Sequence, residues 1–254
     1  MVLSGSHYGL DGTKTTPVTS LSPPPFTSLS AQREGRFPLR RAQLSDEVAG
    51  HLRASIMSGA LRPGTYIRLD ETAAKLGVSA TPVREALLKL RGEGMVQLEP
   101  HRGHVILPLS RQDVDDIFWV QATIARELAA TAAQNITDAE IGGLEYIIDM
   151  MAAAVAASDT EAIAAGEFAF HRAFNHATGR IKLAWFLLHV ARYMPLMVYA
   201  VDPDWGATAV ANHRELIAAL RRRDTAAVVK LTNWQFSDGA RRLIEKLNGS
   251  GIWD

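Results

Sequence analysis

The sequence predicts a mainly α-helical protein, in which a small mixed module precedes an all-α bundle of six or seven helices. From about residue 111 onward, apolar residues recur with the helical period, and the gaps between these periodic segments are too short for strands. Over about residues 95–107 the period changes to two, which is typical of a hairpin. A chain of 254 residues with 47% hydrophobic content can form two folding units.

The composition narrows the class of protein. The chain has no cysteine, which excludes disulfides, thiol nucleophiles and cysteine-ligated zinc. It shows no signal-like N-terminus and no run of 18 apolar residues, so we expect a cytoplasmic protein without membrane contact. Residues 37–107 hold ten Lys/Arg against seven Asp/Glu, and residues 108–254 hold fourteen against eighteen. A basic module on an acidic body suits contact with phosphates, although a chance fluctuation of a few charges is the simpler alternative.

We expect four segments along the chain. Residues 1–36 are rich in Ser, Thr, Gly and Pro and carry no apolar period, which predicts a disordered tail. Residues 37–108 form the mixed module, residues 109–247 form the helical domain, and residues 248–254 form a short second tail. The boundary between module and domain lies where a β-like run ends and a helix cap begins.

Two helices are expected in the first part of the module. Behind Ser45, which we interpret as an N-cap, apolar residues recur every four positions at Leu44, Val48, Leu52 and Ile56. Residues 69–76 form a second, short amphipathic helix, which Gly77 ends with a left-handed C-cap.

A third helix begins within the segment VSATPVREALLKL. Ser79 or Thr81 caps this helix, and Pro82 lies in its first turn, where the missing N–H removes no helical hydrogen bond. Its inward face carries Val83, Ala86, Leu87 and Leu90. Together with the short helix and the glycine turn before it, this helix predicts a helix-turn-helix over about residues 69–88.

Arg84 lies on the outward face of this third helix, three residues after Thr81. That end of a recognition helix enters the major groove, where arginine can donate two hydrogen bonds to guanine and threonine can bond a base or a phosphate. When this feature is taken alone, a solvated arginine on an ordinary two-helix hairpin is the more common explanation.

The period-two segment predicts a hairpin over about residues 95–107, whose tip carries His101, Arg102 and Gly103. Such a hairpin is typical of a wing, from which Arg102 reaches a narrow minor groove or its phosphates. An ordinary β-turn also explains the hairpin alone. The order and spacing of the helices and the hairpin within one module favour a winged helix-turn-helix.

The helical domain begins where Pro108 closes the β-like run and Ser110 can cap a helix with Asp113 in its first turn. Within this domain we place helices at about residues 111–134, 138–157, 160–177, 181–200, 206–222 and 224–247. The many alanines allow close helix approach, as in a bundle.

The bundle contains one candidate metal site. Glu167 and His171 lie four residues apart and hence one turn apart on the same helical face, where they can share a divalent cation. His213 shares one side of its helix with the core positions Leu216, Ile217 and Leu220. For an isolated pair of this spacing, a surface ion pair or a core histidine is the more common explanation.

The segment PGTYIRLDETAAKLGVSATPVREALLKLRGEGMVQLEPHRGHVI closely resembles the DNA-binding domain of GntR-family transcription regulators. The helical body resembles the ligand-binding FCD domain of the FadR branch, and the resemblance covers about residues 40–247. It implies a homodimeric transcription regulator that binds a pseudo-palindromic double-stranded DNA operator and responds to a small-molecule effector in the bundle. DNA-binding residues are then expected at Ser79, Thr81, Pro82, Arg84, His101, Arg102 and Gly103.

One position of the specific VSxTPVREAL signature departs from the family. Where the family usually has arginine between the serine and the threonine, this chain has Ala80. In the resemblance that arginine contacts bases. The operator of this chain is therefore expected to differ from the usual one, or to be bound more weakly.

Metal-binding members of the FadR branch carry an aspartate, a histidine four residues later, and two histidines on later helices. In this resemblance Glu167, His171 and His213 match the first three ligands, with glutamate in place of aspartate, and Gln235 stands at the fourth position. The resemblance implies one divalent ion (Zn, Ni or Mn), with Gln235 or water completing the coordination. A weakened site, or loss of the metal, is the alternative, since a glutamine oxygen is a weak ligand for zinc or nickel.

The first bundle helix of the branch usually brings an arginine and a glutamate four residues later, where this chain has Gln121 and Ala125. Loss of that arginine removes a counter-charge for a carboxylate effector. Arg126, Arg172 or Arg192 could substitute, so we expect an effector pocket that involves Gln121, Arg172 and Arg192.

Two other functions stay open. A metal-dependent enzyme could use the histidine and carboxylate pocket, but the sequence has no evident nucleophile, Gly-rich phosphate loop or H-E-x-x-H run, so an enzyme is not expected. A metal-dependent interaction protein that no longer binds DNA is the third reading, which Ala80 keeps open.

Overall fold

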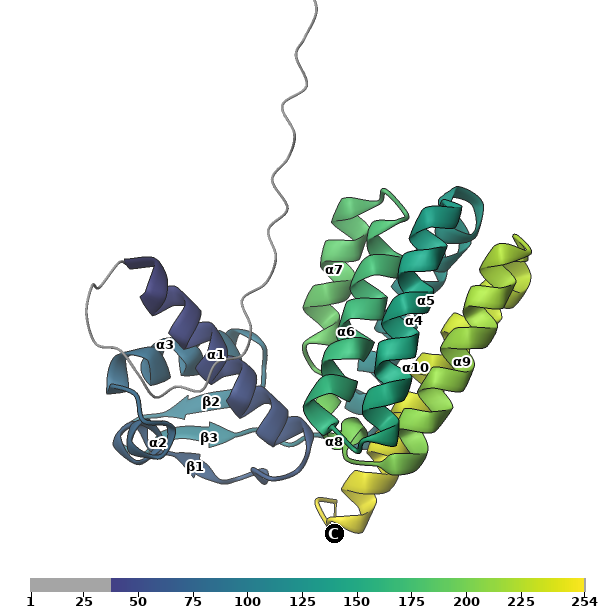
Figure 1. Ribbon diagram of the computed structural model, residues 1–254. Coiled ribbons are helices and arrows are strands. Elements are labelled where there is room, and N and C mark those ends of the chain that lie inside the picture. Colours follow the sequence, from purple (N-terminus) through teal and green to yellow (C-terminus); the bar gives the residue numbers. More distant parts are fainter. Residues whose placement is uncertain (1–37, 254) are drawn as a thin grey trace, which may run out of the picture. The chain divides into compact units, whose positions relative to one another are not determined.

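The computed structural model describes residues 38–253, without the side chains of residues 38–42 and 203. The tail predicted over residues 1–36 lies outside the described residues. The described part is mainly helical and contains one small sheet (Figure 1). The fold class predicted from the sequence is therefore confirmed, whereas the domain boundary near residue 108 stays a prediction.

The mixed module begins with α1 (Pro38–Met57), whose apolar stripe is buried as expected. The helix starts well before Ser45, so the predicted cap at Ser45 is wrong. Ser45 lies inside α1, where its hydroxyl accepts a hydrogen bond from Nζ of Lys89 at 2.8 Å. Serine is tolerated inside a helix when its side chain has such a partner, and spacing alone does not reveal that partner.

α2 (Leu69–Leu76) and α3 (Ala80–Gly92) form the predicted helix-turn-helix. Gly77 ends α2 with φ +67°, and its N–H bonds to carbonyl groups of the last turn, which confirms the left-handed C-cap. The predicted inward face of α3 is also confirmed, because four of its apolar side chains have no exposed surface: Val83, Ala86, Leu87 and Leu90.

A three-stranded antiparallel sheet completes the module. β2 (Val96–Glu99) and β3 (Gly103–Ile106) form the predicted hairpin. β1 (Tyr66–Ile67) pairs with the other edge of β3, which gives the strand order β1-β3-β2. The sequence did not predict β1, because a strand of two residues is too short to show a period.

Seven helices follow in the described part of the chain. The long helices among them lie roughly side by side along a common direction in Figure 1, as expected for a bundle. Capping boxes at Ser110 and Thr137 begin the first two, and the cap predicted at Ser110 is confirmed. The bounds are α4 (Arg111–Asn135), α5 (Asp138–Ala156), α6 (Thr160–His176), α7 (Ile181–Ala191), α8 (Leu196–Ala200), α9 (Pro203–Arg221) and α10 (Thr225–Gly249).

Two helix predictions were wrong, both because of a proline. The single helix expected over residues 181–200 is broken between α7 and α8, since Pro195 has no N–H and disfavours a helical residue before it. α9 begins earlier than residue 206, because Asp202 caps it and Pro203 occupies the first turn. Proline is favoured at that position, since its missing N–H has no partner there in any case.

α6, which carries Glu167 and His171, packs closely on α5. A Cβ added to Gly166 would lie 3.0 Å from Cβ of Met151, a tight contact that would require Met151 to shift. The absence of a side chain at Gly166 therefore favours this close approach. Among the helices of residues 38–253, none combines the length and apolar character required to cross a bilayer.

Candidate DNA-binding surface and candidate metal centre

The N-terminal end of α3 presents a polar surface. Ser79 is the N-cap residue of α3, and its side chain makes no capping hydrogen bond. Ser79 and Arg84 are exposed, and Thr81 between them is partly exposed. The first N–H groups of a helix have no intrahelical partner and carry partial positive charge, so this end attracts anions. The three side chains can therefore contact phosphates and base edges from one helix end.

Two other residues of the signature offer no polar group to this surface. Pro82 is buried, so its ring contributes to the module core and does not project from the helix. Ala80 opens α3 with a methyl group only. Among the residues expected here, polar contacts with DNA are therefore available from Ser79, Thr81 and Arg84.

The tip of the β2–β3 hairpin is a tight turn. The residue after Pro100, His101, has φ +64°, and the N–H of Arg102 donates to the carbonyl oxygen of Glu99 at 3.1 Å, as in a type II turn. Gly103 has φ +103°, a conformation that disfavours any other residue. His101 and Arg102 are thereby presented on the exposed tip.

Two residues that sequence patterns did not reveal lie beside the wing: Tyr66 of β1 and Arg68, the N-cap residue of α2. With His101 and Arg102 they line a hollow of about 420 Å³. The hydroxyl of Tyr66 donates to Glu99 at 2.5 Å and accepts from Arg102 at 3.4 Å. The hydrogen bond to Tyr66 raises the pKa of the Arg102 guanidinium. Two permanently charged guanidinium groups beside one hollow suit phosphate or a narrow minor groove.

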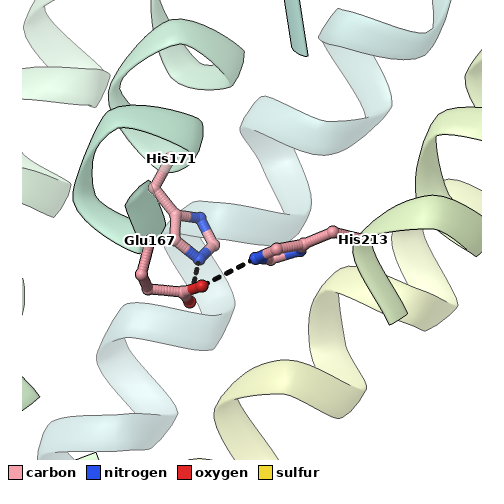
Figure 2. A group of neighbouring side chains, drawn as sticks. All are labelled: Glu167, His171 and His213. Carbon is pink, nitrogen blue, oxygen red and sulfur yellow. Dashed lines mark hydrogen bonds and ion pairs between the residues drawn. The ribbon is translucent and has the colours of Figure 1, made fainter. Parts of the chain in front are cut away.

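In the bundle, the three predicted metal ligands lie together. Figure 2 shows Glu167 and His171 of α6 facing His213 of α9. Oε1 of Glu167 lies 3.0 Å from Nε2 of His171, and Oε2 lies 2.8 Å from Nε2 of His213. One ligand atom from each residue lies within 4.8 Å of the other two. Glu167 and His171 meet because they lie four residues apart on one helix, and the packing of α9 against α6 brings His213 to them.

Most of this cluster lies in the protein interior, with His171 partly exposed. Glu167 and His213 are buried, and the ring of Phe170 stacks on His213 with centroids 4.0 Å apart. Burial alone raises the pKa of the Glu167 carboxyl. The charges and hydrogen bonds of His213 and His171 outweigh this effect and hold the pKa of Glu167 well below its usual range. Glu167 is therefore a carboxylate at neutral pH and can act as a ligand.

Gln235 of α10 lies on the opposite side of His213 from Glu167. Its Nε2 lies 2.7 Å from Nδ1 of His213 and 2.6 Å from Oδ1 of Asn212. An amide donor at Nδ1 places the imidazole proton on Nε2, which then donates to Glu167. Oε1 of Gln235 is buried and has no hydrogen-bond partner among the described residues.

The donor set of the cluster fits a divalent cation. One carboxylate and two imidazoles suit Zn, Ni or Mn. One ligand atom of each residue lies within 4.8 Å of the other two, so one ion could reach all three after small side-chain adjustments. For Nε2 of His213 to coordinate, its proton must move to Nδ1. Reversal of the Gln235 amide then lets the unpaired Oε1 accept that proton's hydrogen bond.

The residues predicted for the effector pocket lie in different environments. Gln121 is buried on α4, where Nε2 donates to the carbonyl oxygen of Val190 at 3.1 Å and Oε1 has no partner among the described residues. Arg172 is exposed on α6. Arg192 lies 3.2 Å from the carboxylate of Glu93. Of the three, Gln121 is the one with an unused polar atom in the interior.

Two family models match the sequence. The model for "Bacterial regulatory proteins, gntR family" matches residues 44–106, which include α2, α3 and the wing. The model for the "FCD domain" matches residues 116–233, which include Glu167, His171 and His213. The two matches thus separate the candidate DNA-binding surface from the candidate metal centre.

Curated proteins and a solved structure agree with these matches. A regulator in the TAR-I ttuE-ttuC' intergenic region of Agrobacterium vitis is 34% identical over 125 residues, which cover 47% of this chain and 72% of that protein. The gluconate operon transcriptional repressor of Bacillus licheniformis is 29% identical over 210 residues, covering 79% and 85%. The structure of E. coli McbR/YncC has a TM-score of 0.64 at 23% identity and covers 80% of this chain and 97% of its own, which shows a shared fold.

Proposed function

Because the chain belongs to the GntR family of bacterial regulatory proteins and carries an FCD domain, we propose that its α3 end and wing read an operator while its buried cluster binds a metal and an effector. The general role is that of a DNA-binding transcription regulator with an effector-binding helical domain. The observation that carries the proposal is the exposed Arg84 beside the unpaired N–H groups of α3.

Each part of the proposed DNA surface has its own task. Arg84 donates two hydrogen bonds to a guanine edge, and Ser79 and Thr81 contact phosphate or base. Arg102 and Arg68 hold phosphates or enter the minor groove from the wing hollow. Two copies of the chain, related by a two-fold axis, read the two halves of a pseudo-palindrome.

The proposed metal is held by Glu167, His171 and His213, which leave coordination positions open for water or an effector oxygen. When bound, the ion supplies a positive charge that can attract an anionic effector. Gln235 acts from behind His213. With its amide reversed, so that Oε1 takes the place of Nε2 beside Nδ1, it would accept from Nδ1–H and keep Nε2 unprotonated and turned toward the ion.

The proposed effector is a hydroxylated organic acid. Two buried oxygens besides that of Gln235 have no hydrogen-bond partner among the described residues, Oε1 of Gln121 and Oγ1 of Thr232. Buried acceptors are normally paired, so a ligand rich in hydroxyl donors suits them, and its carboxylate suits the ion. The name of the gluconate operon repressor, a relative of this chain, supports this class of ligand.

The test of the proposed function is a gel-shift titration with the DNA upstream of the chain's own gene. At one fixed salt concentration, half-saturation should need about 10³-fold less protein than for unrelated DNA of equal length and composition. Equal affinity for both fragments would contradict the proposal that the protein recognises a specific operator sequence. A decrease or increase in operator affinity on addition of gluconate, with no effect of an uncharged polyol, would support an acidic effector.

The metal is tested by elemental analysis after treatment with chelator and reloading with Zn, Ni or Mn. We expect close to one ion per chain, lost from His171→Ala and retained by His176→Ala, an exposed histidine on the same helix. Gln235→Leu should keep the three ligands but lower the affinity for the metal by about 10–100-fold. Occupancy should fall in acid as the imidazoles take up protons. Sub-stoichiometric metal in the parent, without a thermal shift, contradicts the site.

We assign the cluster to ligand binding and propose no catalytic step for it. Within the described residues, the side chain of Glu167 makes its polar contacts with His171 and His213, and neither is a hydroxyl that it could activate as a nucleophile. Access to an operator requires the compartment that holds the chromosome, so we place the regulator in the cytoplasm.

A further inference from the structure

The residues that follow α10 fold back onto the rest of the chain. α10 ends at Gly249, and the backbone turns at Gly251, whose φ of +65° is a conformation that glycine adopts without strain. The next two side chains, Ile252 and Trp253, pack against the hydrophobic core. Ordering such a segment costs conformational entropy, which its contacts must offset. We call residues 250–253 the return segment.

The return segment holds the connection between the wing and the bundle. This connection is residues 107–110, between β3 and α4. The indole N–H of Trp253 donates to the backbone carbonyl oxygen of Leu109, whose side chain is buried. Arg111, the first residue of α4, places its guanidinium 5.1 Å from the centroid of the Trp253 ring and donates to Oδ1 of Asn248. A rotation of the backbone within the connection would break these contacts.

The return segment also supports the DNA-binding module, at the turn that follows α1. Nη2 of Arg62 donates to the backbone carbonyl oxygen of Ser250 at 2.6 Å. A Cβ added to Gly59 would lie 3.2 Å from Oγ of Ser250 and 3.5 Å from Cδ1 of Ile252. Gly59 has φ +75°, so both its backbone and this close approach favour glycine. One short segment thus contacts the module, the connection and the start of the bundle.

The module meets the bundle at a second place, through weaker contacts. Arg192, at the end of α7, lies 3.2 Å from the carboxylate of Glu93, which follows α3. The ring of Tyr193 lies 5.9 Å from the guanidinium of Arg53. Ion pairs and cation–π contacts with access to water contribute little to stability and are screened by salt. Without the contacts of Trp253, the module would therefore be free to turn about its connection.

We propose that Trp253 is a positioning residue, which fixes the orientation of the DNA-binding module on the bundle and thereby determines the separation of half-sites that two copies of the chain accept. The inference rests on the proposed function, in which two modules read the two halves of a pseudo-palindrome. The separation of half-sites that such a pair binds depends on the geometry of its two modules. Trp253 acts on this geometry through its hydrogen bond to the connection, without touching DNA.

The geometry of DNA makes this selection sharp. Each base pair inserted between two half-sites moves one of them by about 3.4 Å and turns it by about 34° around the helix axis. A module held by the return segment cannot follow such a step without breaking its contacts. A released module can, because a connection of four residues spans up to about 14 Å when extended. Loss of the Trp253 contacts should therefore broaden the range of separations that the protein accepts.

Two variants test the contacts and a third is the control. Trp253→Ala removes both the indole donor and the ring beside Arg111. Arg62→Ala removes the hydrogen bond to Ser250 from an exposed side chain, so it should leave folding intact. Trp234→Ala, the control, removes the same type of side chain from α10, where Trp234 is 41% exposed. A general effect of losing a tryptophan would appear in the control as well.

The experiment is a gel-shift titration of the full chain at one fixed salt concentration. The DNA is the operator fragment that the parent binds, together with versions that have one or two base pairs inserted at its centre. The insertions should weaken binding at least about tenfold for the parent and Trp234→Ala, the cost of about one mismatched base pair. For Trp253→Ala the loss should be less than about threefold, with Arg62→Ala intermediate.

Equal losses for the parent, Trp253→Ala and Arg62→Ala would overturn the proposal. Far-UV circular dichroism shows whether Trp253→Ala is folded, and if it is not, Arg62→Ala decides alone. A loss for Arg62→Ala smaller than that of the parent then supports the proposal, and an equal loss overturns it.

Limited proteolysis tests the attachment without DNA. Trypsin should cleave after Arg111 faster in Trp253→Ala and Arg62→Ala than in the parent and Trp234→Ala, because a released connection opens more often to protease. Mass spectrometry of the fragments identifies this cut, and equal rates in all four proteins would overturn the attachment. Failure of the proposed function has a different signature: the parent would bind operator and unrelated DNA equally, whatever the cleavage rates.

Discussion

The two candidate sites of the chain are built in opposite ways. At the end of α3, Ser79, Thr81 and Arg84 fall within six consecutive residues and reach the surface. In the bundle, Glu167 and His213 are 46 residues apart and meet in the interior. A contiguous pattern defines the first site, whereas the second exists only after α6 and α9 have packed.

Because of this difference, substitutions in the two sites should change different properties of the protein. Removing an exposed arginine leaves the folded chain almost unchanged, because water replaces its contacts. Removing a buried carboxylate leaves two imidazole groups without their acceptor, and unpaired buried groups destabilise the fold. Substitutions in the first site should therefore change operator affinity, and substitutions in the second should first change stability.

The largest effect is expected from Glu167→Ala. Loss of the carboxylate between His171 and His213 should lower the free energy of unfolding by about 3 to 5 kcal/mol, measured by urea unfolding of metal-free protein. Glu161→Ala, at an exposed position of the same helix, is the control and should cost less than about 1 kcal/mol. Similar small losses for both variants would mean that the cluster contributes nothing to the fold.

Arg84→Ala should have the next largest effect, which is on operator affinity and not on stability. We expect a loss of about 1 to 3 kcal/mol in operator affinity by gel shift, with the melting temperature unchanged. Arg222→Ala, which removes an exposed arginine at the end of α9, should leave affinity as it was. Intact operator binding by Arg84→Ala would show that α3 does not read bases.

A smaller effect is expected from a buried histidine that has no carboxylate partner among the described residues. His104 of β3 is buried, and burial together with the charge of Arg91 lowers its pKa below the ordinary value of 6.5. As the pH falls below 6.5, the unfolded chain takes up a proton that the folded chain does not. Stability therefore falls, by at most about 1.4 kcal/mol per pH unit, until the lowered pKa is passed.

His104→Leu removes this contribution, so the stability of the parent relative to the variant should decrease between pH 7 and pH 5. Urea unfolding of both proteins at several pH values measures this difference. A difference that does not change with pH would show that His104 titrates alike in the folded and unfolded chain.

The smallest effect is expected at the wing. Arg102→Ala should flatten the dependence of log affinity on log salt concentration by about one unit, the contribution of one phosphate contact. Base preference should stay the same, since phosphate contacts carry no sequence information. A salt dependence equal to that of the parent would show that Arg102 of the wing makes no phosphate contact.

The features that could be predicted from the sequence depend on single residues acting on their own segment. Gly77 ends α2 through its left-handed backbone, and Ser110 begins α4 through its hydroxyl. The inward face of α3 follows from spacing alone. Glu167 and His171 belong to the same group, because a spacing of four residues places them together in any helix.

The features that escaped prediction depend on contacts between segments. β1 exists because Tyr66 and Ile67 pair with β3, and two residues carry no period of their own. The position of Gln235 behind His213 depends on how α10 is rotated against α9. Arg172 is exposed, although the residue before it, His171, belongs to the cluster. Periodicity alone did not decide which of the three candidate arginines faces the interior.

At the wing tip, the residues that fix the backbone shape of the turn differ from the residue whose side chain projects from it. The shape depends on the left-handed backbone at His101 and on Gly103, where an added Cβ would lie 3.3 Å from the carbonyl oxygen of Ile67. The side chain of residue 102 projects from that frame, 73% of it exposed. A library that keeps glycine at 103, limits position 101 to His, Asn or Gly, and varies position 102 would offer many chemistries on one backbone. Selection for new operators could begin from such a library with the fold held constant.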